Sequence, residues 1–141
     1  MKQIFMDTNV VIDFLADRQP FSLDAAKLFN MSIEGRIKIH ISAVSYNNIY
    51  YVLRQSLTNN ATIKLLENLA DITDIADVSN QVIRQSLKAD FKDYEDAIQY
   101  YSALTVPNID FIVTRNTKDF KKSSLSVLTP TEAIAKLSSE V

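Results

Sequence analysis

Short apolar runs alternate along the chain with longer stretches in which apolar residues recur at helical spacing. The runs predict strands at residues 4–6, 37–41, 111–113 and 127–128, with a weaker candidate at 72–78. The longer stretches predict helices at residues 10–16, 22–33, 62–70, 82–89, 93–104 and 131–137, and one more from Ser42 or Ser45 to Leu57. Strands that alternate with helices favour an α/β fold with a mainly parallel central sheet covered on both faces.

The second predicted helix carries signals at both of its ends. Ser22 is a candidate N-cap, because its hydroxyl can accept a hydrogen bond from a free amide of the first turn. Gly35 is well placed to end the helix, because glycine readily adopts the left-handed conformation that follows many helix C-termini.

The composition is that of an ordinary globular protein, with 47% hydrophobic and 23% charged residues. We expect a single domain of residues 1–141, because this length allows one continuous core. No apolar stretch approaches the roughly 20 residues that span a bilayer, and the first strand begins too early to leave room for a signal peptide. The absence of cysteine fits a reducing compartment, so we expect a cytoplasmic protein without membrane association.

The same composition narrows the possible chemistry. The chain has no Cys, one His and one Gly, which excludes a thiol nucleophile and the glycine-rich phosphate loops, and disfavours a Cys/His zinc site or a serine hydrolase. Any catalysis must then depend on carboxylates, which suit a hard cation such as Mg²⁺ or Mn²⁺. A net charge of −2 argues against broad, charge-driven binding of nucleic acid, but a bound cation would reverse the local field.

Polar residues follow three of the predicted strands directly. Asp7, Ser42 and the segment Thr114–Asn116 each come after a strand end. Carboxyl ends of parallel strands meet at one edge of a sheet, so these residues are expected to lie together there. Asp7 has an alternative role as the N-cap of the first helix, unless Asn9 caps that helix and leaves Asp7 for a metal.

Two acidic residues open the helix predicted at 93–104. Asp93 and Asp96 are three residues apart and so share one side of its first turn. Their structural alternative is to complement the helix dipole. If Asp7 lies nearby, however, the gathered negative charge favours a bound cation.

The loop after the strand at 111–113 holds further candidates. The Thr114 hydroxyl and the side chain of Asn116 or Asp119 could orient a metal-bound water or a phosphate. Arg115 and Lys118 belong to a short basic segment there, and an ordinary solvated loop is the alternative for the whole stretch.

Four segments together resemble the PIN-domain ribonucleases, especially the compact prokaryotic type that includes the VapC toxins of toxin–antitoxin pairs. The resemblance covers nearly the whole chain and rests on Met6–Val10, Ile41–Ser45, Asp93–Ala97 and Val113–Asn116, the last leading to Asp119–Phe120. It implies a three-layer α/β/α sandwich with an acidic pocket at the carboxyl edge of a parallel sheet. Such pockets use three or four carboxylates to bind Mg²⁺ or Mn²⁺ and hydrolyse RNA.

Carried over residue by residue, the resemblance assigns Asp7, Asp96 and Asp93 to the metal. Two positions depart from the family pattern. Asn48 and Asn116 each stand where an acidic residue is common. An amide oxygen can ligate a cation or hold a water, but it brings no charge and should weaken cation binding. Asp119 or Glu95 would be able to compensate.

Three hypotheses follow for the function. The first is a metal-dependent endoribonuclease, the toxin of a toxin–antitoxin pair, in which Asn48, Asn116 or Asp119 orient waters while Arg115 and Lys118 contact RNA phosphates. A small antitoxin protein and a homodimer are implied partners. The second is a silenced module of the same fold that binds RNA or a partner protein without cleavage. The third is a phosphatase or phosphotransfer domain with Asp7 as the nucleophile.

Overall fold

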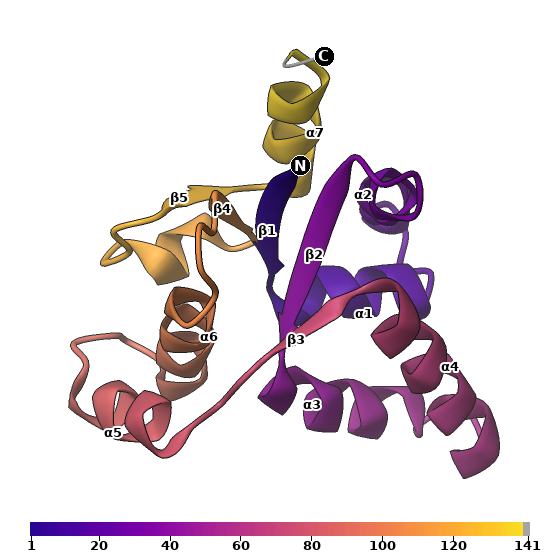
Figure 1. The fold of residues 1–141 in the computed structure, drawn as a ribbon. Coiled ribbons are helices and arrows are strands. Elements are labelled where there is room, and N and C mark those ends of the chain that lie inside the picture. The colour runs from indigo at the N-terminus through magenta and orange to yellow at the C-terminus, as the bar shows by residue number, and fades with distance from the viewer. Residues whose placement is uncertain (140–141) are drawn as a thin grey trace.

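The structure is a computed structural model that describes residues 1–139, so residues 140 and 141 of the predicted domain lie outside the described residues. Figure 1 shows the arrangement of its strands and helices. The elements in chain order are β1 (Lys2–Met6), α1 (Thr8–Leu15), α2 (Ser22–Ile33), β2 (Ile37–Ser42), α3 (Ala43–Leu53), α4 (Asn59–Ile72), β3 (Asp74–Ala76), α5 (Asn80–Lys88), α6 (Tyr94–Leu104), β4 (Phe111–Val113), the 3₁₀ helix η1 (Thr117–Phe120), β5 (Ser126–Leu128) and α7 (Pro130–Ser139).

The five strands form one parallel sheet in the order β3-β2-β1-β4-β5. The first strand of the chain is therefore the central one, between β2 and β4. Helices cover both faces, which confirms the three-layer α/β/α sandwich and the parallel sheet predicted from the sequence (Figure 1). Because all strands run the same way, their carboxyl ends lie along one edge, at the bottom of Figure 1.

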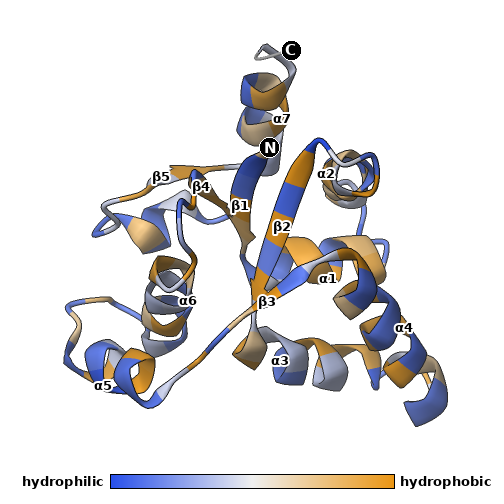
Figure 2. Ribbon diagram, in the orientation of Figure 1, coloured by the Kyte–Doolittle hydropathy of each residue, from blue (hydrophilic) through white to orange (hydrophobic). Residues whose placement is uncertain are grey.

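Alternation along the strands divides the core between the two faces. Ile4 and Met6 on β1 pack with residues from α1, α2, α3, α4 and α7, whereas Phe5 packs with Tyr100 and Ala103 of α6. Figure 2 shows the same alternation along β2 as bands of orange and blue, because Lys38 and His40 separate three isoleucines. Within residues 1–139, no helix has both the length and the apolar character that a membrane crossing requires.

The predicted strands and helices are all present, with bounds that differ by a few residues, and the structure adds η1. Gly35 ends α2 as predicted, with a φ of 78° and hydrogen bonds from its own amide and from that of Arg36 back into the last turn. The prediction of Ser22 as N-cap is wrong. Phe21 occupies the cap position, and the Ser22 hydroxyl instead accepts a hydrogen bond from Nε2 of Gln19 at 3.1 Å.

Candidate active site

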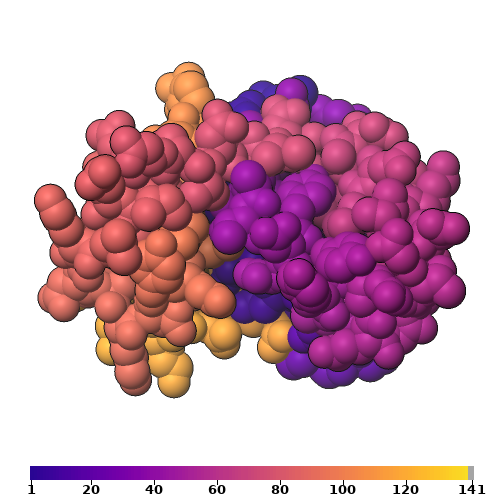
Figure 3. Space-filling model, turned by 90° about the horizontal axis from the view of Figure 1, so that it is seen from below, coloured from indigo at the N-terminus to yellow at the C-terminus, as the bar shows by residue number. Residues whose placement is uncertain are grey.

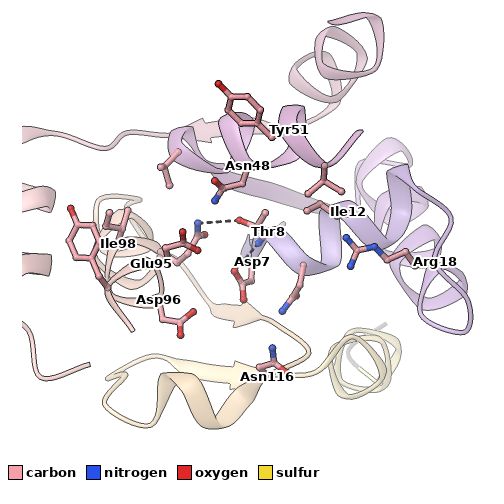
Figure 4. A pocket seen from close by; sticks show the side chains of 15 residues that line it. Asp7, Thr8, Ile12, Arg18, Asn48, Tyr51, Glu95, Asp96, Ile98 and Asn116 are labelled. Atoms are coloured by element: carbon pink, nitrogen blue, oxygen red, sulfur yellow. Dashed lines mark hydrogen bonds between the residues drawn. The ribbon is translucent and has the colours of Figure 1, made fainter. Parts of the chain in front are cut away.

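A pocket of about 630 Å³ opens at the carboxyl edge of the sheet, between α3 and α6. Figure 3 views this edge directly and shows a hollow between the magenta segment that contains α3 and the orange segment that contains α6. Indigo N-terminal residues lie at the bottom of the hollow. The predicted site residues that line the pocket are Asp7, Asn48, Asp96 and Asn116 (Figure 4).

Asp7 joins the end of β1 to the start of α1. It is the N-cap of α1, and its Oδ1 accepts a hydrogen bond from the Thr8 amide at 2.8 Å. Its Oδ2 accepts one from the Thr114 hydroxyl at 2.7 Å, and its backbone amide donates to the Val113 carbonyl. Each carboxylate oxygen can accept two hydrogen bonds, so capping leaves acceptor capacity on both oxygens. The two alternative roles predicted for Asp7 are therefore compatible.

The charge of Asp7 is held in an unfavourable environment, since only 7% of the residue is exposed. Burial raises the pKa of Asp7, while the hydrogen bonds from Thr114 and the Thr8 amide oppose that rise. The carboxylate of Asp119 raises the pKa of Asp7 further, and Arg115 lowers it. A cation at this position would relieve the desolvation and repulsion that the carboxylate experiences.

Asp96 faces Asp7 from the first turn of α6. The pKa of Asp96 is raised to about 7, first by burial and then by the carboxylates of Asp7 and Asp119, with further contributions from Asp93 and Glu95. α6 comes directly before β4 in the chain, and the N-terminal turn of α6 lies at the carboxyl edge of the sheet (Figure 1). Near neutral pH, a proton and a cation would therefore compete for the Asp96 carboxylate.

Asp93 and Asp119 occupy different positions from the three acidic residues that line the pocket, Asp7, Glu95 and Asp96. Asp93 caps α6 by accepting a hydrogen bond from the Glu95 amide at 2.7 Å, and it is exposed. Asp119 lies exposed on η1 and acts on the pocket through its charge. Across residues 1–139, no three His, Asp or Glu side chains are close enough together to hold a metal ion.

Arg115 and Lys118 were predicted to contact RNA phosphates, and the structure separates them. The Arg115 guanidinium pairs with the fully buried carboxylate of Asp13, at 2.6 Å from Nε and 3.3 Å from Nη2. It also lies 4.1 Å from the centre of the Phe21 ring. Lys118 is exposed on η1 and does not line the pocket. Arg18, which sequence reasoning missed, does line it.

Comparison with protein families matches residues 3–118 to the PIN domain. The chain belongs to the PIN-domain family. Comparison with curated proteins found no match. Among solved structures, VapBC-1 from nontypeable Haemophilus influenzae aligns with a TM-score of 0.66 and 17% identity, over 92% of this chain and 98% of that one.

Two further solved structures share the fold. A toxin–antitoxin complex from Klebsiella pneumoniae aligns with a TM-score of 0.63 and 23% identity, over 90% of this chain and 97% of that one. FitAcB from Neisseria gonorrhoeae aligns with a TM-score of 0.62 and 17% identity, over 91% and 98%. The family resemblance inferred from the sequence is confirmed.

This PIN domain also holds a largely buried polar cluster that sequence reasoning did not identify. Thr8, Ser45 and Gln99 come from α1, α3 and α6, and their side chains are joined by hydrogen bonds of 2.7 to 3.2 Å. One signal was available, because Gln99 follows Asp96 by three residues on the same helix and so lies on the same side. The cluster links the three helices that surround the pocket.

Two exposed tyrosines flank the mouth of the pocket. Tyr51 on α3 is 70% exposed, and Tyr94 on α6 is 43% exposed. Tyr51 packs edge-on against Tyr50, whose hydroxyl donates to Oδ1 of Asn59 at 2.6 Å. The mouth thus presents aromatic rings on both of the helices that border it.

Proposed function

We propose that this PIN domain is a metal-dependent endoribonuclease that hydrolyses RNA phosphodiester bonds. The observation that carries the proposal is the convergence of Asp7 and Asp96 in the pocket at the carboxyl edge of the sheet. Membership of the PIN family supports it. In parallel α/β sheets, ligands bind outside the carboxyl ends of the strands, where both residues lie.

The donor set of the pocket suits a hard divalent cation. Asp7, Glu95 and Asp96 offer carboxylate oxygens, and Asn48 and Asn116 offer amide oxygens. Mg²⁺ commonly keeps several waters and is held by one or two carboxylates together with substrate phosphates, so a group of three acidic residues is not required. We assign Asp7 and Asp96 to Mg²⁺ or Mn²⁺, with Asp93 and Asp119 contributing charge from outside the pocket.

When bound, the cation would supply charge that activates water and neutralises the phosphate in the transition state. The protein's own part is to hold the reacting groups. Thr114 orients Asp7 through its hydrogen bond to Oδ2, and Asn48 and Asn116 orient water on the open side of the pocket. Lys118 on η1 positions the RNA backbone, whereas the pairing of Arg115 with Asp13 favours a role in holding the loop.

The solved structures that share the fold support a biological setting. They include VapBC and FitAB assemblies and a toxin–antitoxin complex. We infer that the protein is the toxin of such a pair, that a small antitoxin binds it and that it forms a homodimer. Coexpression with the adjacent reading frame, followed by copurification and a growth assay, tests this assignment. Growth that is unaffected by the protein alone would contradict it.

The direct test of the enzyme is RNA cleavage by the purified protein in Mn²⁺ or Mg²⁺. Cleavage is expected in wild type and should be lost in Asp7→Asn, in Asp96→Asn and in EDTA. Circular dichroism and thermal melting show whether each variant is folded. Full activity in a folded Asp7→Asn variant would remove the proposed site.

The amides of Asn48 and Asn116 favour one alternative function, a module that binds RNA or a protein without cleaving it. Two uncharged residues weaken the attraction of the pocket for cations. Titration calorimetry with Mn²⁺ separates the two functions. Binding that is lost in Asp7→Asn supports the enzyme, and no binding at millimolar Mn²⁺ supports the module.

A further inference from the structure

The cluster of Thr8, Ser45 and Gln99 has hydrogen-bond directions that can be assigned. Nε2 of Gln99 donates to Oγ1 of Thr8 at 3.2 Å and to Oγ of Ser45 at 2.9 Å. The two hydroxyl oxygens are 2.7 Å apart, so one donates to the other. Figure 4 shows Thr8 beside Asp7, with one of these bonds drawn.

The orientation of the Gln99 amide follows from the cost of burying unpaired groups. Gln99 is 4% exposed, and among the described residues its Oε1 has no hydrogen-bond partner. The reversed amide would bury an NH₂ group with two unpaired donors in place of one unpaired acceptor. The amide nitrogen therefore faces the two hydroxyls and uses both of its protons on them.

This arrangement determines where the proton of Ser45 goes. Ser45 is fully buried, and within residues 1–139 its hydroxyl has two hydrogen-bond partners, the Gln99 nitrogen, which only donates, and the Thr8 oxygen. Ser45 must then donate to Thr8. Oγ1 of Thr8 accepts two hydrogen bonds, and both of its lone pairs are occupied.

The proton of Thr8 is left without an acceptor among residues 1–139, and Thr8 lines the pocket. We propose that the Thr8 hydroxyl donates a hydrogen bond to a non-bridging oxygen of the RNA phosphate at the cleavage position. This inference rests on the proposed function. It also excludes Thr8 from the cation ligands, because an oxygen that already accepts two hydrogen bonds has no lone pair for a metal.

The experiment compares Thr8→Val, which keeps the shape but removes the hydroxyl, with Thr8→Ser, which restores it. Thr62→Val is the matched control, because Thr62 is also a threonine near the start of a helix, and its hydroxyl donates to a backbone carbonyl away from the pocket. Three quantities are measured for each protein: kcat for RNA cleavage, the Kd for Mn²⁺ by calorimetry, and the Kd for a fluorescein-labelled 2′-O-methyl RNA oligonucleotide by anisotropy with Mn²⁺ present.

We expect Thr8→Val to lower kcat and weaken oligonucleotide binding by about 10- to 100-fold, the usual effect of losing a hydrogen bond to a charged group. Its Kd for Mn²⁺ should stay within about threefold of wild type, since no ligand is lost. Thr8→Ser should restore cleavage and binding, and Thr62→Val should resemble wild type in all three measurements.

Two results would overturn the inference: wild-type oligonucleotide binding in Thr8→Val, or loss of Mn²⁺ binding in that variant, which would make Thr8 a ligand. Absence of cleavage in wild type would instead refute the proposed function, and the anisotropy comparison would still decide the role of Thr8. A wild-type protein that binds no oligonucleotide would overturn both.

Discussion

The hydroxyl of Thr114 donates a 2.7 Å hydrogen bond to Oδ2 of Asp7 and so joins the end of β4 to the residue that follows β1. The same hydroxyl oxygen accepts a hydrogen bond from the backbone amide of Asn116 at 3.1 Å. Thr114 therefore fixes both an acidic residue of the pocket and the loop that carries Asn116. Its own side chain is fully buried, which keeps water from replacing these bonds.

Replacing Thr114 by valine should disturb the pocket through Asp7. In wild type, the hydrogen bond from Thr114 opposes the pKa rise that burial imposes on Asp7. Thr114→Val lacks this bond, so the pKa of Asp7 should rise further in that variant. We expect about a tenfold weaker affinity for Mn²⁺ near pH 7, since a hydrogen bond to a charged group contributes about 1.5–3 kcal/mol. Calorimetry measures this, with Thr114→Ser as the control that keeps the hydroxyl. Equal affinities in the valine and serine variants would contradict the role assigned to Thr114.

The raised pKa of Asp96 predicts how stability depends on pH in EDTA. The folded-state pKa of about 7 lies above the value of 3.8 expected for an unperturbed Asp, so between these pH values the folded protein binds more protons than the unfolded chain. Stability from this group should thus fall as pH rises from about 4 through 7. Thermal melting should show Asp96→Asn gaining stability over wild type at pH 8 and losing most of that gain at pH 5. Parallel pH profiles for the two proteins would be inconsistent with the raised pKa.

Arg115 should matter for folding more than for RNA binding. Asp13 is fully buried, and its second cation, Arg18, lies at 3.8 Å. Removal of Arg115 leaves the buried carboxylate with Arg18 as its one cationic partner among the described residues, so Arg115→Ala should cost about 3 kcal/mol in free energy of unfolding. Arg115→Lys should recover part of the loss, because lysine keeps the charge but lacks the planar fork of arginine. Urea denaturation gives both values, and a change under about 0.5 kcal/mol in Arg115→Ala would count against the assignment.

Lys118 should show the opposite behaviour to Arg115 and matter for RNA binding more than for folding. It is exposed on η1, so Lys118→Ala should leave the free energy of unfolding within about 0.5 kcal/mol of wild type. If Lys118 contacts phosphate, the variant should bind RNA more weakly and with a smaller dependence of log Kd on log salt. Anisotropy titrations at several salt concentrations measure that slope. An unchanged slope would remove Lys118 from the RNA contacts.

Tyr51 and Tyr94 are predicted to stack on unpaired bases of the RNA at the mouth of the pocket. Alanine at either position should weaken binding of single-stranded RNA by about 5- to 100-fold, because stacking of one base on an aromatic ring contributes about 1–3 kcal/mol. Tyr51→Phe should bind as wild type does. Leu87→Ala is the matched control, since Leu87 is 67% exposed on α5 and does not line the pocket. Similar losses in the Leu87 and Tyr51 variants would show that surface apolarity alone explains the effect.

The sequence predicted the fold and the two central acids for identifiable reasons. Alternation of apolar positions defined the strands, and the rule that parallel strand ends share an edge brought Asp7 together with the segment after β4. Asp96 was recognised from its place in the first turn of a helix and from the family resemblance. The position of Asp93 outside the pocket could not be predicted from the sequence, because it depends on Asp93, and not a neighbouring residue, capping α6.

Other contacts depend on packing that spacing does not encode. Asp13 interrupts the apolar run of α1, and a charge on a buried face signals a partner, but nothing local identifies that partner as Arg115, which is 102 positions away. Likewise, the cluster of Thr8, Ser45 and Gln99 depends on the rotamers of three side chains that meet from three different helices. Such contacts become visible only when the helices are placed in space.

The hydrogen bond between Thr114 and Asp7 spans 107 positions of the chain, and the central strand β1 is synthesised before the other four strands of the sheet. During translation, a growing chain cannot complete this pocket until β4 and the residues after it have left the ribosome. Nascent and truncated chains that end before Thr114 therefore lack the assembled site. Under the proposed toxin function, this order of synthesis postpones any activity until the segment that follows β4 has been translated.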